Sequence, residues 1–175
     1  MEAIRKFDKT KLKNVIMEVK NFEYIEDFTI DNQAINIFPG LFISSLTGAQ
    51  NVETLKENKI THILTLIPWK INIPKDLNIQ NKKIKMYDTE EYDLLSTLPE
   101  ALDYIEYVIE NKGNVLVHCH AGVSRSGSVV IAAIMKMKKI PFEEAYKFAK
   151  EKRQSIQPNP HFIKQLQIFS KSLAN

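Results

Sequence analysis

The sequence predicts an α/β fold with a mixed, largely parallel central sheet flanked by helices. Short apolar stretches of strand-like composition alternate along the chain with longer stretches whose apolar residues recur at helical spacing. Such an alternation favours helices packed on a largely parallel sheet. The chain has 175 residues, of which 44% are hydrophobic and 26% charged, so it is long enough for one compact domain with a substantial core.

The first elements follow from composition and from turn residues. "INIF" at 35–38 and "LFIS" at 41–44 are strand-like and are joined by a Pro-Gly turn, so two strands are expected there. A helix is expected over residues 49–58. The apolar stretch "THILTLI" then predicts a strand over residues 61–67.

The middle of the chain is predicted to form a loop, a strand, a helix and a second strand. Residues 68–82 carry two prolines and three asparagines and are expected to be a loop, and "KIKMYD" at 83–88 is expected to be a strand. A helix is predicted over residues 97–110, because leucines and isoleucines recur there on one face. Pro99 is expected near its start, where the missing N–H costs little. "NVLVH" at 114–118 predicts a buried strand.

The rest of the chain is predicted to be helical. An apolar helix is expected over residues 125–138, Pro141 is expected to open a helix that runs to about residue 152, and Pro160 to open the last helix. Residues 1–34 are interpreted as an N-terminal leader. Its apolar residues at helical spacing predict a short amphipathic helix docked on the domain: Leu12, Val15, Ile16 and Val19.

The segment "NVLVHCHAGVSRSGS" holds the only cysteine of the chain, Cys119, and one of its three arginines, Arg125. It joins a predicted strand to a predicted helix through small residues. The N–H groups at the start of a helix attract a phosphate dianion, and Gly122 lets the backbone curl around it. The Arg125 guanidinium can grip two phosphoryl oxygens, which a lysine ammonium cannot. Cys119 would then face the phosphorus as a nucleophile.

Two other interpretations of this segment are possible from residue chemistry. A single buried cysteine is often an inert small apolar residue. A metal site made by His118, Cys119 and His120 is disfavoured, because on an extended chain the histidines face one way and the cysteine the other. No second pair of ligands is evident in the sequence, so no metal or cofactor is expected. The nucleophile interpretation accounts for the cysteine, the arginine and the strand-to-helix context together.

The stretch "HCHAGVSRS" resembles the signature of cysteine-dependent protein phosphatases, Cys-x5-Arg-Ser/Thr, and "AGVSRS" is the form typical of dual-specificity phosphatases. The resemblance covers roughly residues 35–170 and is nearest to the small atypical members, which lack a separate kinase-docking domain. It implies a cysteine-dependent phosphatase fold with residues 35–172 as the catalytic domain. It also implies a loop that binds the phosphoryl group, made of His120, Ala121, Gly122, Val123, Ser124 and Arg125.

The resemblance further implies a general acid about thirty residues before the nucleophile, which is where Asp88 lies. The acidic stretch around it also contains Glu90, Glu91 and Asp93; chemistry alone does not choose among them, and Asp93 is the second candidate.

The resemblance assigns supporting roles to residues on both sides of the arginine. Ser126 is expected to hydrogen-bond the thiolate, to cap the helix, or both, and His118 to orient the loop. "RQSIQPNPHFIKQL" matches a family segment that places Arg153 and Asn159 at the border of the site, although either could simply cap the last helix. The role of His120 is left open.

The function implied is hydrolysis of phosphotyrosine and phosphoserine or phosphothreonine in proteins through a phosphocysteine intermediate. Alternatives are a phosphoinositide or RNA 5′-phosphate phosphatase that uses the same loop, a non-catalytic phosphoprotein-binding module, and a sulfurtransferase. Lipid-directed relatives carry lysines inside the loop, which are absent here. A sulfurtransferase would leave Asp88 and the "IQPN" segment unexplained.

Composition narrows the partners and the compartment. The formal net charge of +3 comes from scattered lysines, so nucleic acid is not expected as a partner. One cysteine allows no intramolecular disulfide, and the longest apolar run, Val129 to Met135, is too short to cross a bilayer. The expected setting is the cytoplasm, with the nucleus as an alternative, and the expected partners are phosphorylated proteins, kinases among them. No membrane anchor is expected, and the oligomeric state and the physiological substrate are left open.

Overall fold

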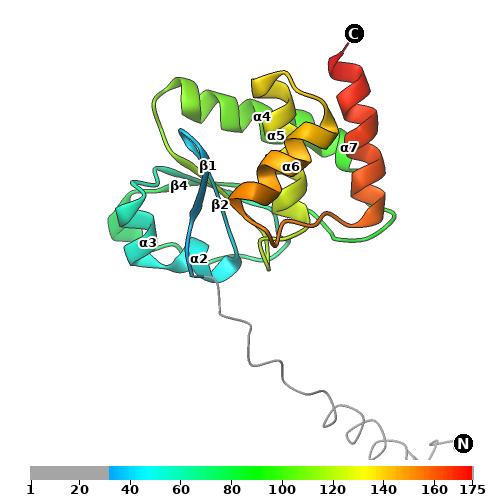
Figure 1. The fold of residues 1–175 in the computed structure, drawn as a ribbon. Coiled ribbons are helices and arrows are strands. Elements are labelled where there is room, and N and C mark those ends of the chain that lie inside the picture. The colour runs from blue at the N-terminus through cyan, green and yellow to red at the C-terminus, as the bar shows by residue number, and fades with distance from the viewer. Residues whose placement is uncertain (1–31, 175) are drawn as a thin grey trace, which may run out of the picture. The chain divides into compact units, whose positions relative to one another are not determined.

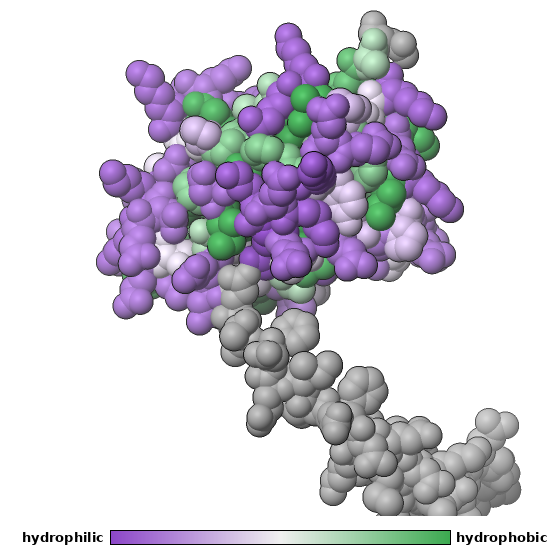
Figure 2. Space-filling model, viewed as in Figure 1, coloured by the Kyte–Doolittle hydropathy of each residue, from purple (hydrophilic) through white to green (hydrophobic). Residues whose placement is uncertain are grey.

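The computed structural model of the chain describes residues 32–174. The amphipathic helix expected around Leu12 to Val19, and most of the leader expected over residues 1–34, lie outside the described residues. Figure 1 shows the described part as a sheet with helices on both of its faces. Figure 2 shows that hydrophilic side chains cover most of the face turned to the viewer. Within residues 32–174 no helix is long and apolar enough to cross a membrane.

The sheet has five strands in the order β1-β2-β5-β3-β4. Their bounds are β1 Ile35–Phe38, β2 Leu41–Ser44, β3 His62–Thr65, β4 Gln80–Lys83 and β5 Val115–His118. β1 and β2 form an antiparallel hairpin, and all other pairs are parallel. The predicted mixed, largely parallel α/β sheet is therefore confirmed.

The central strand β5 brings its carboxyl end level with those of its neighbours. Ser44 and Thr65, the last residues of β2 and β3, both pair with His118. Successive side chains of these strands point to opposite faces, as strand geometry requires. Val115 and Val117 belong to one core cluster and Leu116 to another. Both faces of β5 are thus buried, and the segment that follows His118 starts from a fixed position.

Helices form the outer layers (Figure 1). Their bounds are α2 Leu46–Gln50, α3 Val52–Glu57, η1 Lys75–Leu77, α4 Leu94–Glu110, α5 Arg125–Lys138, α6 Phe142–Lys152 and α7 Pro160–Leu173. Buried residues of α4, α5, α6 and α7 form the larger core cluster with one face of the sheet. The smaller cluster uses the other face together with Ala49 of α2 and Leu55 of α3.

The strand expected over residues 83–88 is wrong, and so is part of the loop expected over residues 68–82. That loop contains η1 and also β4, which begins at Gln80 and ends at Lys83. β4 is an edge strand of sequence QNKK that is mostly exposed, so it carries no apolar pattern. The alternating pattern after it reflects Ile84 and Met86, which are buried in the core but outside the sheet.

Two helix predictions needed correction at their boundaries. The helix expected over residues 49–58 is divided into α2 and α3 at Asn51, whose side chain accepts a hydrogen bond from Thr54 N–H and so caps α3. α4 begins at Leu94, earlier than expected, because Asp93 caps it. Pro99 therefore lies inside the helix, where its missing N–H removes an intrahelical donor.

The other predicted elements are confirmed. α5 has the predicted bounds, and Pro141 and Pro160 stand at the starts of α6 and α7. α5 is buried without a break from Ser126 to Met135, which explains why its sequence is apolar on every side.

Candidate active site

The cysteine-containing loop runs over residues 119–124, between the end of β5 and the start of α5. Its carbonyl groups are bound from outside the loop at both ends. Leu46 N–H of α2 donates to His120 O at 2.9 Å, and Gln157 N–H donates to Val123 O at 3.1 Å. These contacts fix the direction in which the peptide groups of the loop point.

Arg153 binds the two carbonyls between them. Its Nε donates to Gly122 O at 3.1 Å and its Nη2 to Ala121 O at 3.4 Å. Arg153 is 7% exposed, and its burial lowers the pKa of the guanidinium. Arg153 thus lies beside the loop and holds its carbonyl side.

The consequence is a loop whose N–H groups face inward. A trans peptide directs its C=O and its N–H to opposite sides, and the described residues contain no cis peptide bond. Because the carbonyls of residues 120–123 are bound outside the loop, the N–H groups of residues 121–124 point to its interior. Such a row of donors at a helix start binds anions.

Gly122 is required by this conformation. Its φ is +72°, in the region that favours glycine. A Cβ added there would lie 2.7 Å from the carbonyl oxygen of Ser44. The loop therefore packs directly against the end of β2, and no other residue type fits at this position without strain.

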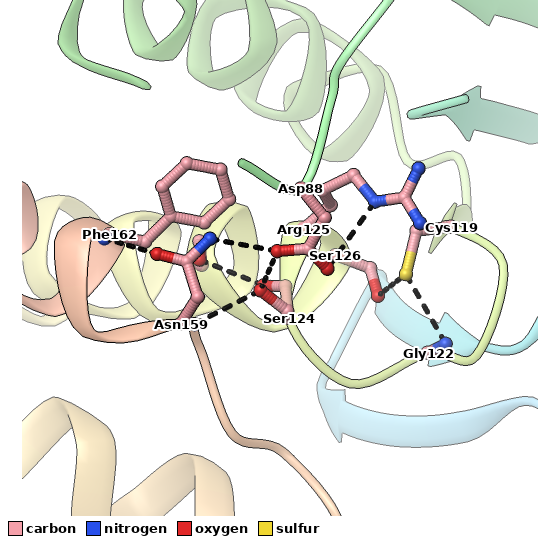
Figure 3. A network of polar contacts seen from close by, with 9 residues as sticks. Asp88, Cys119, Gly122, Ser124, Arg125, Ser126, Asn159 and Phe162 are labelled. Atoms are coloured by element: carbon pink, nitrogen blue, oxygen red, sulfur yellow. Dashed lines mark hydrogen bonds and ion pairs between the residues drawn. The ribbon is translucent and has the colours of Figure 1, made fainter. Parts of the chain in front are cut away.

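The Cys119 sulfur lies within this loop and makes hydrogen bonds with Gly122 and Ser126 (Figure 3). Gly122 N–H donates to Sγ at 3.3 Å, and Ser126 Oγ lies 3.2 Å from Sγ. Cys119 is 1% exposed. Ser124, rather than Ser126, occupies the N-cap position of α5. The Ser126 hydroxyl lies against the sulfur instead.

Arg125, the first residue of α5, brings a nearly buried positive charge to the loop. Its side chain is 12% exposed, and its Nε lies 3.8 Å from Asp88 Oδ2. Among residues 32–174, Arg125 Nε is a buried side-chain nitrogen without a hydrogen-bond partner. A buried donor of this kind favours an anionic acceptor.

Asp88 lies next to Arg125 and is held by two neutral donors (Figure 3). Ser124 Oγ donates to Asp88 Oδ1 at 2.7 Å, and Asn159 Nδ2 donates to the same oxygen at 2.8 Å. The backbone N–H of Asn159 also donates to Ser124 Oγ at 3.1 Å. Asp88, the loop and the start of α7 therefore form one network.

The other acidic candidates lie elsewhere. Asp93 accepts a hydrogen bond from Ser96 N–H at 3.1 Å and caps α4, while Glu90 and Glu91 are exposed. Of the four carboxylates in this acidic stretch, Asp88, which the family resemblance favoured, is the one that the described structure pairs with Arg125. The link through Ser124 was not foreseen, because nothing in its local sequence indicates a partner 36 residues away.

His118 is fully buried below the loop. Its Nδ1 lies 3.0 Å from Cys119 O and its Nε2 lies 2.9 Å from Thr65 Oγ1. Burial, with a smaller effect of the Arg125 charge, lowers the pKa of His118 to about 4. The ring is therefore neutral at pH 7, with Nδ1 donating to the carbonyl of Cys119, a geometry suited to orienting the loop.

Asn159 and His120 complete the set of sequence-predicted residues. Asn159 Oδ1 accepts a hydrogen bond from Phe162 N–H at 2.8 Å, so Asn159 caps α7 as well as binding Asp88. His120 is exposed, and its ring lies against Trp69, a residue that the sequence analysis did not single out. Within residues 32–174 no three histidine, cysteine or acidic side chains are grouped so that they could hold a metal ion.

Comparison with known proteins identifies the family to which this chain is similar. Residues 41–172 match the family described as dual specificity phosphatase, catalytic domain. The chain is 44% identical over 132 residues to dual specificity protein phosphatase MPK-4 of Drosophila melanogaster, covering 74% of this chain and 34% of that protein. It is 37% identical over 146 residues to dual specificity protein phosphatase 19 of Mus musculus, covering 83% and 66% respectively.

Comparison with solved structures indicates the same family. The crystal structure of DUSP15 superposes with a TM-score of 0.76 at 30% sequence identity, covering 81% of this chain and 92% of that chain. The match spans about a third of the fly protein and just under two thirds of the mouse protein. The family that the motif indicated is confirmed: this chain belongs to the dual specificity phosphatases.

Proposed function

We propose that this chain hydrolyses phosphotyrosine, phosphoserine and phosphothreonine in proteins through a phosphocysteine intermediate. The observation that carries the proposal is the Cys119 sulfur at the centre of an inward-facing row of N–H groups, with the Arg125 guanidinium beside it. We assign the activity to residues 35–172, and we take residues 1–34 to be an N-terminal leader. The reducing environment of the cytoplasm suits a chain with a single cysteine.

The first chemical step is transfer of the phosphoryl group to sulfur. The Cys119 thiolate forms a bond to phosphorus as the bond from phosphorus to the side-chain oxygen of the substrate breaks. Asp88 gives its proton to that leaving oxygen. The N–H groups of residues 121–124 and Arg125 stabilise the charge on the phosphoryl oxygens.

The second step regenerates the enzyme. Asp88, now a carboxylate, takes a proton from a water molecule that attacks the phosphocysteine. The bond from sulfur to phosphorus breaks, inorganic phosphate is released, and the thiolate is restored. The hydroxyl of Ser126, 3.2 Å from the sulfur, is placed to stabilise the thiolate as it leaves.

An assay with an aryl phosphate in the presence of EDTA tests the chemistry. Wild-type protein should hydrolyse phenyl phosphate, and Cys119→Ser should abolish turnover. Asp88→Asn should lower kcat by roughly 10²-fold to 10⁴-fold with this poor leaving group. The matched control is Asp93→Asn, which keeps a good helix cap and should retain activity. Turnover by Cys119→Ser would refute the proposal.

Matched substrates test the substrate class. Phosphotyrosine and phosphothreonine peptides of one sequence should both be hydrolysed, the tyrosine ester faster because its oxygen leaves more easily. The partners would then be phosphorylated proteins, which a substrate-trapping pulldown with Asp88→Ala would retain. A large preference for phosphoinositides over both peptides would overturn the assignment to proteins.

A further inference from the structure

Trp69, the only tryptophan of the chain, lies beside the phosphate-binding loop and is 47% exposed. Its ring centroid is 6.0 Å from that of His120, with the two planes at 74°, an edge-to-face arrangement. His120 directly follows the nucleophile Cys119. A large apolar side chain therefore stands exposed next to the site of the proposed chemistry.

The exposure of Trp69 is not the result of a loose segment. Pro68 O, directly before it, accepts a hydrogen bond from Lys83 Nζ at 2.6 Å. Asn72 O accepts one from Gln50 Nε2 at 3.3 Å. Between them Ile71 packs against both core clusters. The backbone on either side of Trp69 is thus bound to β4, α2 and the core, while its ring stays outside.

We propose that Trp69, supported by the ring of His120, binds an apolar side chain of the substrate that flanks the phosphorylated residue. This inference rests on the proposed function and names a determinant of its substrate choice. Tryptophan is the residue type that contributes most often to binding energy at protein interfaces, and its cost of immobilisation is small when it is already held in place. The subsite therefore selects phosphopeptides with an aromatic or aliphatic neighbour.

Kinetics with matched phosphopeptides test the subsite. The reference phosphotyrosine peptide carries alanine at both of the positions that directly flank the phosphotyrosine. In each variant peptide one of these alanines is replaced by phenylalanine. Wild type should prefer at least one phenylalanine peptide by about tenfold in kcat/KM. Trp69→Ala should lose this preference and keep its kcat/KM for phenyl phosphate within about twofold. Lys70→Ala, an exposed neighbour on the same segment, is the matched control and should retain the preference.

Tryptophan fluorescence gives a second measurement that needs no turnover. Because the chain has one tryptophan, the emission of Cys119→Ser reports on Trp69 alone. Titration with each phenylalanine peptide in turn should shift the emission to shorter wavelength for at least one of them, and the alanine peptide should not shift it. Without turnover of any peptide the proposed function fails, whereas the emission shift still decides whether Trp69 binds the flanking side chain.

Three results would overturn the inference. The first is equal use of all peptides by wild type together with no emission shift. The second is an equal loss by Trp69→Ala on peptides and phenyl phosphate, which would make Trp69 a support of the loop. The third is a phenylalanine preference that disappears in His120→Ala and persists in Trp69→Ala, which would assign the subsite to the imidazole.

Discussion

Asn159 performs two tasks that substitution can separate. Its Oδ1 caps α7 by accepting from Phe162 N–H, and its Nδ2 donates to Asp88. Asn159→Ser keeps a good capping acceptor but removes the amide that reaches Asp88. Asn159→Ala removes both. If Asn159 positions the general acid, the serine variant should be stable and slow, and the alanine variant unstable and slow.

The expected magnitudes follow from the contacts. A hydrogen bond to a charged group contributes about 1.5–3 kcal/mol. The Asp88 side chain is 34% exposed, so solvent screening reduces this to roughly 1 kcal/mol. A difference of that size corresponds to about a fivefold loss of kcat/KM. Loss of the cap should cost Asn159→Ala about 1 kcal/mol of unfolding free energy, and Asn159→Ser about half of that or less.

The assay compares aryl phosphates with leaving groups of different acidity. The loss in Asn159→Ser should be largest with phenyl phosphate, which needs the proton, and smallest with p-nitrophenyl phosphate. Urea unfolding of both variants gives the stability term separately. Wild-type kcat/KM for phenyl phosphate in Asn159→Ser, or an equal loss with every leaving group, would refute the positioning role.

Three further predictions concern the loop and its support. Arg125→Lys keeps the charge but loses the planar fork, so kcat/KM for an aryl phosphate should fall at least about tenfold; near-normal kcat/KM would contradict the bidentate argument. Gly122→Ala should lower the unfolding free energy by at least about 2 kcal/mol in urea titration, because φ is +72° and the new Cβ meets Ser44 O. Gly127→Ala, whose Cβ meets an isoleucine side chain, should cost less. The pKa of His118 is lowered to about 4 in the folded chain, whereas an unfolded histidine has a pKa near 6.5. Between these two values the unfolded chain is protonated at His118 and the folded chain is not. Stability should be complete above pH 6.5 and fall by roughly 3 kcal/mol as the pH decreases to 4; urea unfolding across this range should show a smaller decrease in His118→Asn, and the same decrease in both proteins would contradict the assignment.

The sequence by itself determined the core of the fold and the type of chemistry. β5, α5 and the loop between them are local: an apolar strand, small residues with one glycine, and a helix start follow one another within a few residues of Cys119. Local geometry therefore sets their conformation, and the bounds of α5 were predicted correctly. β4 could not be predicted in the same way, because a polar edge strand is held by its hydrogen bonds to β3 and leaves no apolar pattern.

The family resemblance favoured Asp88 as the general acid, but only the tertiary structure shows which carboxylate lies beside the arginine. Asp88 and Asp93 are five positions apart in one acidic stretch, and residue chemistry alone does not distinguish them. The start of α4 uses Asp93 as a cap, whereas the loop and α7 supply Ser124 and Asn159 to Asp88. Those partners are 36 and 71 residues away, and their approach depends on helix packing around the sheet. The position of Trp69 is also set by the tertiary structure, because the parallel pairing of β3 with β5 places it beside His120.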